Sequence, residues 1–281
     1  MADWCPGRPE AMSDTVSRPS GDLVLRLISA AVLIPFALWV VWQGGVALAL
    51  GCAAFALAMG YEWVRMSASP LMKKILPLAM LPVLIAAVLG PFFGGVALIV
   101  CAGIAGVLHP VQTERVPSAM GLAYVAGMPL ALFLLREGAW DGVAAALILM
   151  GMVWGSDSAA YFTGRALGGP KLTPDSPSKT WSGAGGAVVF TTLCGILAAR
   201  ITGGDLTMWL CAGVLISVFA QMGDLVESRM KRRYGVKDAS GLIPGHGGVM
   251  DRVDGLGIVC VVAVIGFYAF PVIVERLGLA A

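Results

Sequence analysis

Residues 207–226 read TMWLCAGVLISVFAQMGDLV. Apart from Asp224 near the end, this stretch carries no charge and consists mostly of apolar side chains. An α-helix of about 20 residues rises about 30 Å, which matches the hydrocarbon core of a bilayer. A helix also satisfies its own backbone hydrogen bonds, as a segment in lipid must. The stretch therefore predicts a membrane-spanning helix.

Apolar runs of similar length recur along the whole chain. Of its 281 residues, 58% are hydrophobic and 13% are charged, and the mean hydropathy is +0.84. This composition excludes an ordinary water-soluble globule. We predict an all-α, polytopic integral membrane protein with about nine transmembrane helices, at residues 23–42, 45–63, 75–92, 94–109, 119–135, 141–161, 183–201, 207–226 and 255–274.

The segments outside the helices suggest how the chain is divided. Residues 1–22 combine Pro, Gly and charges of both signs, which is typical of a disordered tail. We expect this tail to be cytoplasmic, followed by N-terminal transmembrane helices over 23–135 and C-terminal ones over 136–281. The second group carries two long polar loops, 162–182 and 227–254, which we expect to be cytoplasmic and catalytic. The six cysteines form no CxxC pair, and five lie in apolar runs, which favours small core residues over disulfides or zinc ligands.

Basic residues predict the orientation in the membrane. With the N-terminus inside, 16 of the 19 Lys and Arg fall in inner segments, and only Arg136, Arg200 and Arg276 fall outside. Because cytoplasmic segments carry the excess of Lys and Arg, we predict a cytoplasmic N-terminus and a C-terminus across the membrane. The charged loops then face the cytoplasm.

Acidic residues flank the second long loop. Residues 221–254 read QMGDLVESRMKRRYGVKDASGLIPGHGGVMDRVD. Asp224, Glu227 and Ser228 are spaced i, i+3 and i+4, so they share one helical face, and Asp251 and Asp254 form a second acidic pair where the last helix begins. An acidic residue at a spanning helix costs about 3 kcal/mol or more to desolvate, which favours a functional role for Asp224. Asp251 and Asp254 could also cap the last helix.

Between the acidic pairs lie cations and glycines. The cations are Arg229, Lys231, Arg232, Arg233 and Lys237, and the glycine-rich stretch is 245–248, GHGG. Carboxylates suit Mg²⁺, Lys and Arg neutralise phosphates, and glycine lets backbone N–H groups approach an anion. Together they favour phosphoryl or nucleotidyl transfer. The basic stretch alone could instead anchor the chain to anionic lipids, and His246 could be an ordinary hydrogen-bonded loop histidine.

One long motif within this loop resembles a known family. Residues 228–254 fit the pattern SxMKRxxxxKDxSxxIPxHGGVxDRVD. The pattern is similar to the signature of the phosphatidate cytidylyltransferases, also called CDP-diacylglycerol synthases. Residues 154–181, WGSDSAAYFTGRALGGPKLTPDSPSKTW, resemble that family's other inner loop, although Ser182 departs from the Glu or Gln expected before Gly183. In this segment, Asp157 could be a helix cap or a metal ligand, and Lys179 a snorkelling anchor or a phosphate ligand.

The resemblance implies a reaction and a set of site residues. The phosphate of phosphatidic acid would attack the α-phosphorus of CTP, giving CDP-diacylglycerol and pyrophosphate. The implied catalytic residues are Asp224, Asp251, Asp254 and Lys237, and the three aspartates would also hold Mg²⁺, with a monovalent cation such as K⁺ as a candidate to share the site. The implied substrate-binding residues are Asp157, Ser178, Lys179, Ser228, Lys231, Arg232, His246, Gly247, Gly248 and Arg252.

The same resemblance predicts the partners and the location. We expect CTP, phosphatidic acid and membrane lipids as partners, no nucleic acid, and a homodimer. We expect the protein in a bacterial inner membrane with the active site facing the cytoplasm. Rival readings are a polyprenol kinase, a CDP-alcohol phosphotransferase, whose DG…AR…G…D…D motif is missing here, and a transporter. Transport predicts charges at mid-membrane or inverted repeats, neither of which the sequence contains.

Overall fold

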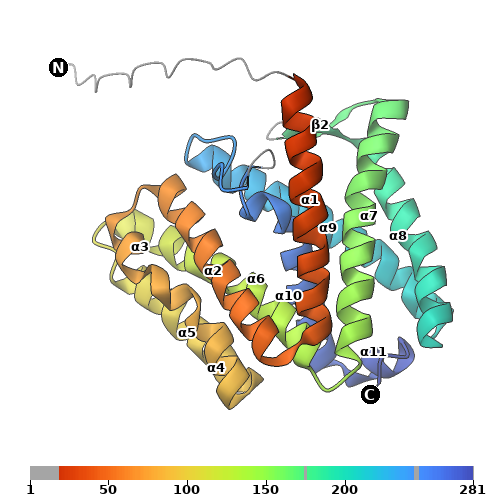
Figure 1. Cartoon of the computed structure of the whole chain (residues 1–281), viewed down its shortest axis with the longest axis horizontal. Helices are drawn as coiled ribbons and strands as arrows, with labels where there is room; N and C mark the ends of the chain where they lie inside the picture. The colour runs from red at the N-terminus through yellow and green to blue at the C-terminus, as the bar shows by residue number, and fades with distance from the viewer. Residues whose placement is uncertain (1–18, 174–175, 244–246, 281) are drawn as a thin grey trace.

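The computed structural model of the chain describes residues 19–173, 176–243 and 247–280. Within these ranges the chain is a bundle of helices with a short antiparallel strand pair (Figure 1). The helices are α1 (Pro19–Gln43), α2 (Gly45–Ser67), α3 (Pro70–Ile75), α4 (Leu81–Leu89), α5 (Pro91–Val107), α6 (Arg115–Glu137), α7 (Gly142–Leu167), α8 (Trp181–Thr202), α9 (Leu206–Arg233), α10 (Asp254–Ala269) and α11 (Pro271–Arg276). The 3₁₀ turns and strands are η1 (Leu76–Ala79), η2 (Gln112–Glu114), η3 (Met250–Arg252), β1 (Lys171–Thr173) and β2 (Ser176–Thr180).

The long helices fit a membrane. In the part of the chain that the structure describes, six helical segments are long and apolar enough to cross it, namely Gly45–Ser67, Pro70–Leu89, Gln112–Glu137, Gly142–Leu167, Trp181–Thr202 and Leu206–Arg233. Shorter apolar helices cover Ile28–Gln43, Pro91–Val107 and Asp254–Ala269. Each of the nine predicted runs is thus mainly helical. The chain is an all-α, polytopic membrane protein, while nine crossings and the orientation stay predictions.

Local sequence sets where the helices begin and end. The side chains of Asp141, Thr180 and Asp205 cap α7, α8 and α9 by accepting backbone hydrogen bonds at 3.0, 3.1 and 2.8 Å. The predicted run 255–274 breaks into α10 and α11 at Pro271, since proline lacks an N–H for a continuous helix. Of the predicted tail, residues 1–18 lie outside the described residues, and α1 already begins at Pro19.

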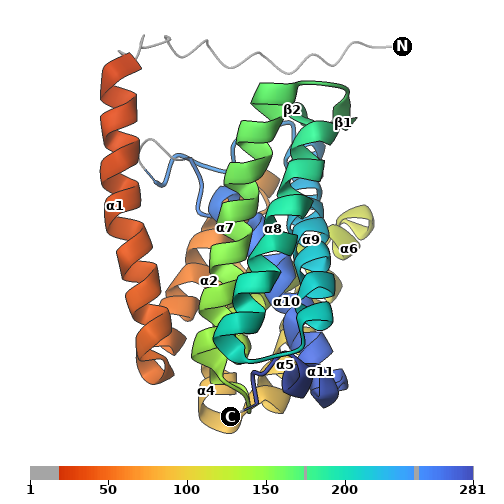
Figure 2. The same cartoon turned by 90° about the vertical axis from the view of Figure 1, so that its right-hand side faces the viewer.

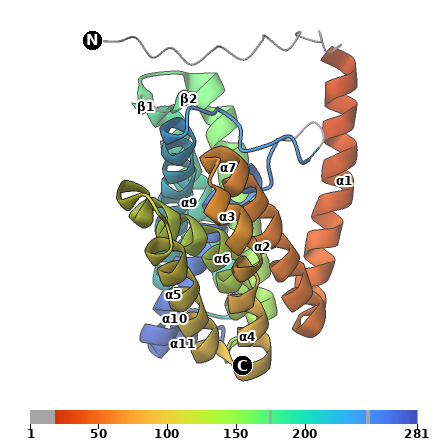
Figure 3. The ribbon, with the colours of Figure 1, turned by 90° about the vertical axis from the view of Figure 1, so that its left-hand side faces the viewer.

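The bundle has two parts. Helices α7, α8 and α9 stand side by side with α10 behind them (Figure 2). Helices α2, α4, α5 and α6 form the other part, and α10 also packs on α6 (Figure 3). The strands lie at one end of the bundle and α11 lies at the opposite end (Figure 2). Strand β1 pairs antiparallel with β2, with Lys171 opposite Thr180.

Each part contains buried apolar side chains. One core joins α6, α7, α9 and α10, and includes Leu149, Trp209 and Phe267. The second joins α2 and α6 to the connection before α10, and includes Met59 and Met250. Many large apolar side chains on the outer surface are exposed, with Val88 80% exposed, as expected of lipid-facing positions. The cysteines in the described residues are free.

Candidate active site

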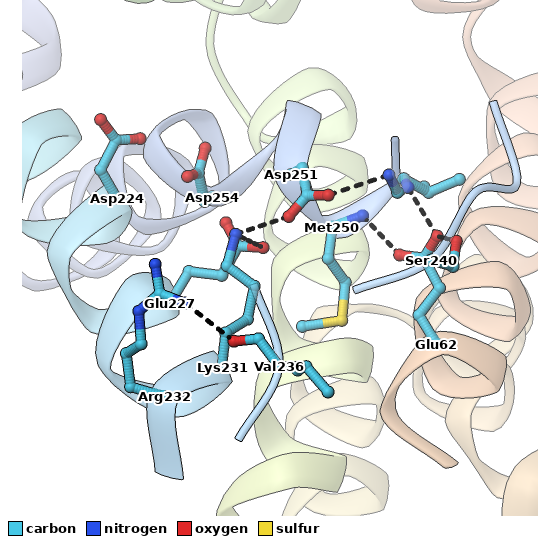
Figure 4. Close-up of polar contacts among 12 residues, drawn as sticks. Glu62, Asp224, Glu227, Lys231, Arg232, Val236, Ser240, Met250, Asp251 and Asp254 are labelled. Carbon is cyan, nitrogen blue, oxygen red and sulfur yellow. Dashed lines mark hydrogen bonds and ion pairs between the residues drawn. The ribbon is translucent and has the colours of Figure 1, made fainter. Parts of the chain in front are cut away.

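Helix α9 carries an acidic face toward the start of α10. Asp224, Glu227 and Lys231 are spaced i, i+3 and i+7, so they share one side of α9. Asp254 is the first residue of α10, and its carboxyl group lies against those of Asp224 and Glu227 (Figure 4). Two of the predicted metal ligands, Asp224 and Asp254, are therefore brought together. We call Asp224, Glu227, Asp251 and Asp254 the acidic cluster.

A glycine allows this approach. A Cβ added at Gly223 would clash with the backbone carbonyl of Asp254, and one added at Gly255 would lie 3.1 Å from the carbonyl oxygen of Ala220. The backbones of α9 and α10 therefore touch at the level of the carboxylates. A larger residue at position 223 would separate Asp224 from Asp254.

Glu227 is the least satisfied member of the acidic cluster. Its side chain is 0% exposed, and neither carboxylate oxygen has a hydrogen-bond partner among the described residues. The ammonium of Lys231 lies 3.4 Å from Glu227 Oε1, which is an ion pair without hydrogen-bond geometry. Buried charges are normally both paired and hydrogen-bonded. Glu227 therefore retains capacity to bind a further cation or donor.

Asp251 is bound to the loop and to α9 at the same time. Its Oδ1 accepts from Lys231 Nζ at 2.6 Å, and its Oδ2 accepts from the Gly248 N–H at 2.9 Å (Figure 4). Burial acts to raise the pKa of the Asp251 carboxyl, but its contact with Glu227 and these two hydrogen bonds hold that pKa below its ordinary value. Asp251 is therefore an anion near neutral pH.

The strand pair brings a further lysine to α9. Lys179, in β2, forms an ion pair and hydrogen bond with Asp224. Asp157, on α7, lies within electrostatic range of Asp224, Lys179 and Arg252. The segments 154–181 and 221–254 thus meet. Ser182, the departure from the family pattern, donates to the Gly168 carbonyl and lies 3.0 Å from the Thr180 hydroxyl, so it ties β2 to the end of α7.

Beside the acidic cluster is a polar pocket of about 310 Å³. It is lined by Ser176, Ser178, Ser228, Lys231, Arg232, Lys237 and Asp238. Sequence analysis predicted five of these as site residues, and the structure brings them together from β2, α9 and the segment that follows α9. Hydroxyl and cationic donors around one hollow suit phosphate oxygens. The volume is at the lower end of the range for small-molecule sites.

A second cavity, of about 170 Å³, differs in chemistry. It lies among α7, α9, α10 and α11, and its lining includes Leu149, Trp209, Phe219 and Phe267. Apolar side chains offer no donor to a phosphate. The polar pocket therefore suits a phosphate better than this cavity does.

The glycine-rich turn has a specific backbone geometry. Gly247 has φ +85°, which favours glycine, and it exchanges backbone hydrogen bonds with Ile243 at 2.9 and 3.1 Å. The Gly248 N–H donates to Asp251. Both amides are therefore engaged within the protein, and the approach of Gly247 and Gly248 to CTP stays a prediction. His246 lies outside the described residues.

The predicted metal ligands can be compared with the needs of Mg²⁺. In the described ranges, no group of three or more His, Cys, Asp or Glu side chains is arranged to hold a metal ion. Asp224 and Asp251 each face a lysine, whereas Asp254 lies against Glu227. Mg²⁺ in phosphoryl-transfer sites takes one or two carboxylates, and its other ligands are water and phosphate oxygens. The oxygens of Glu227, which lie next to Asp254 and have no hydrogen-bond partner among the described residues, fit such a cation.

Comparison with known proteins shows the family of this chain. A sequence model described as the cytidylyltransferase family matches residues 24–270. The chain belongs to this family. It is 41% identical over 253 residues to a phosphatidate cytidylyltransferase of Brucella melitensis, covering 84% of this chain and 89% of the relative. It is 35% identical over 257 residues to the Pseudomonas aeruginosa protein of the same name, covering 82% and 92%. The family resemblance of the two loops is therefore confirmed.

Sequence reasoning missed two polar residues of this cytidylyltransferase-family site. Glu62, on α2, is buried and hydrogen-bonded to the loop before α10. The Tyr124 hydroxyl, on α6, is buried and has no hydrogen-bond partner among the described residues. It lies within electrostatic range of the carboxyl groups of the acidic cluster. A lone carboxylate inside the apolar run 45–63 was the available signal for Glu62, because such a residue is costly in a membrane.

Proposed function

We propose that the chain transfers a cytidylyl group from CTP to phosphatidic acid. A phosphate oxygen of phosphatidic acid forms a bond to the α-phosphorus of CTP, the bond from that phosphorus to the β-phosphate bridge oxygen breaks, and pyrophosphate leaves. The products are CDP-diacylglycerol and pyrophosphate. Membership of the cytidylyltransferase family and relatives named phosphatidate cytidylyltransferase over most of the chain support this reaction.

The observation that carries the proposal is the polar pocket beside the acidic cluster. Lys231 belongs to both, since it lines the pocket and pairs with Asp251 and Glu227. Arg232 and Lys237 add two more cations at the pocket wall. Two phosphate-bearing reactants repel each other, so a site for them must supply fixed positive charge. The pocket has this charge where both loops meet.

Each group has a defined task in the proposed reaction. Lys231, Arg232 and Lys237 neutralise phosphate oxygens, and the hydroxyls of Ser178 and Ser228 donate to them. Lys179 exchanges its partner Asp224 for a phosphate of the nucleotide or lipid. A general base is not required, because the attacking phosphate is already ionised near pH 7. Binding and orientation are therefore the main work of the protein.

We include Mg²⁺ as the cofactor. Asp224, Asp251 and Asp254 are the predicted ligands, and Glu227, which lies against Asp254 and contacts Asp251, would be a further one. When bound, the metal ion offsets the negative charge of the triphosphate and of the leaving pyrophosphate. A monovalent cation such as K⁺ could be accommodated by the same carboxylates, which outnumber the lysines paired with them.

We also propose where the reaction takes place. Nine membrane crossings, with the N-terminus inside and the C-terminus outside, follow from the apolar runs and the basic inner segments. The strands and α11 lie at opposite ends of the bundle, which agrees with this arrangement. The site then faces the cytoplasm at headgroup level, in the inner membrane of a bacterium, where CTP and the lipid phosphate meet. A homodimer is part of the same proposal.

The fate of the CTP phosphates tests the reaction. Purified protein in phosphatidic acid liposomes with Mg²⁺ is given CTP labelled at the α-phosphate or, in a parallel sample, at the γ-phosphate. We expect α-label in the lipid fraction and γ-label in pyrophosphate. Lipid that carries γ-label would identify a kinase, and absence of label from lipid in both samples would contradict the proposal. Omission of phosphatidic acid is the control.

A further inference from the structure

A buried carboxylate from the N-terminal part holds the loop that leads into α10. Glu62 is 0% exposed and lies near the C-terminal end of α2. Its Oε1 accepts from Ser240 Oγ at 2.5 Å and from the Val249 N–H at 2.7 Å, and its Oε2 accepts from the Met250 N–H at 2.7 Å (Figure 4). Both oxygens are therefore used, by donors that are far away in the sequence.

These donors lie on the two sides of the glycine-rich turn. Ser240 precedes the turn, and Val249 and Met250 follow it, while Ile243 and Gly247 bridge it. One carboxylate thus joins Ser240 to Val249 and Met250. Space at this point is tight, since a Cβ added at Gly248 would lie 3.0 Å from Glu62 Oε1 and from Asp251 Oδ2.

The residues that Glu62 holds directly precede two members of the acidic cluster. Val249 is the N-cap of η3, and Met250 is the first residue of η3. The N–H groups of both residues therefore have no acceptor within η3. Glu62 supplies the missing acceptors. Asp251 follows immediately and Asp254 opens α10. A shift of the turn would therefore move both aspartates relative to α9.

We propose that Glu62 is a positioning residue, which fixes Asp251 and Asp254 against α9 through its hydrogen bonds to Ser240, Val249 and Met250. The effect on turnover rests on the proposed function. We call the hydrogen bonds of Glu62 to Ser240, Val249 and Met250 the clamp. The clamp is a property of the fold and can be measured without turnover. Glu62 lies on α2, so its role couples the N-terminal part of the bundle to the site.

The main test is Glu62→Gln. Glutamine keeps the shape but replaces one acceptor oxygen by an NH₂ group that faces an N–H or O–H donor. Hydrogen exchange measured by mass spectrometry should become faster in peptides that cover residues 247–254. Turnover should fall about 10- to 100-fold, as for a lost hydrogen bond to a charged group. The Mg²⁺ concentration for half-maximal activity should rise at least about threefold, a change that a smaller folded fraction alone would not cause.

Two further variants keep the test decisive. Ser240→Ala removes one donor, keeps the carboxylate, and should give the same changes at smaller size. Glu137→Gln is the matched control, because Glu137 accepts from the Gly45 N–H at 2.9 Å at the end of α6, away from the loops. It should leave exchange in 247–254 and the Mg²⁺ dependence as in wild type.

The outcomes separate the two proposals. Wild-type protein that transfers no cytidylyl group would sink the proposed function, while faster exchange in Glu62→Gln would still support the clamp. Exchange and turnover within twofold of wild type in Glu62→Gln would overturn the clamp. If Glu62→Gln does not fold, Ser240→Ala decides. Wild-type exchange and Mg²⁺ dependence in that variant would overturn the proposal, and faster exchange with a weaker Mg²⁺ response would support it.

Discussion

Glu62 and Glu227 are both fully buried glutamates, and their surroundings are opposite. Glu62 receives three hydrogen bonds from described residues, two of them from backbone N–H groups. Glu227 has no hydrogen-bond partner among the described residues and lies beside other carboxylates. A satisfied buried carboxylate organises the protein around itself, whereas an unsatisfied one is prepared for something the protein alone does not supply. The difference indicates a structural role for Glu62 and a ligand-binding role for Glu227.

The largest expected effect separates activity from stability within the acidic cluster. Asp254→Asn keeps the shape and the oxygen that accepts from the Gly255 N–H at 2.8 Å, but replaces the other carboxyl oxygen, next to Asp224 and Glu227, by an NH₂ group that cannot bind a cation. Turnover should fall about 10³-fold, as when a charge-stabilising group is lost. The temperature of thermal unfolding should be unchanged or slightly higher, because repulsion between the neighbouring carboxyl groups is relieved. Activity within tenfold of wild type would remove Asp254 from the site.

The next effect concerns the cation that the acidic cluster shares. Lys231→Met should lower the free energy of unfolding by about 3 kcal/mol, because it leaves the buried Glu227 and the largely buried Asp251 without their ion-pair partner. Unfolding by denaturing detergent measures this loss. Arg233→Met on the same helix is the control, since that side chain is 56% exposed. Equal stability of the two variants would contradict the assigned pairing.

A smaller effect tests the contact of α9 with α10. Gly223→Ala places a methyl group against the Asp254 carbonyl, and overpacking of this kind costs about 1–3 kcal/mol. The added group also pushes Asp224 away from Asp254, so turnover should fall with stability. Gly185→Ala, on α8, meets nothing within 4 Å and should be neutral or slightly stabilising. Normal turnover in Gly223→Ala would show that the close approach is not needed.

The smallest expected effect concerns an exposed ion pair that is away from both Glu62 and Glu227. Glu114→Gln breaks an exposed pair with Arg233, whose N···O distance is 3.8 Å. Both side chains are more than a third exposed, so solvent and salt screen the pair and the loss should stay below about 0.5 kcal/mol. Turnover should also stay within twofold of wild type. A larger loss would indicate that charge at this surface contributes to the site.

Much of this organisation was readable from the sequence. Apolar runs predicted the helices, and the family resemblance implied that Asp224, Asp251 and Asp254 belong to one site. These signals are local or belong to one family motif. The run 75–92 was harder, because Pro77 and Pro82 divide it among α3, η1 and α4.

The other features of the site depend on contacts that the spacing of residues in the sequence does not predict. Glu62 and Ser240 are 178 positions apart, and only packing of α2 against the loop brings them together. Ion pairs of Lys179 with Asp224 and of Lys231 with Asp251 could not be chosen in advance from several possible partners. The strand pair at 171–180 also escaped the helical pattern, since its residues alternate too briefly to indicate strands.

The central claim is that cytidylyl transfer takes place at the acidic cluster and its pocket. Pyrophosphate release by the purified protein with CTP, phosphatidic acid and Mg²⁺ measures it most directly, with ATP and GTP as nucleotide controls. We expect lipid-dependent, CTP-selective release that is lost in Asp224→Ala. Release that persists in Asp224→Ala, or no release from folded wild-type protein in native lipids, would contradict it.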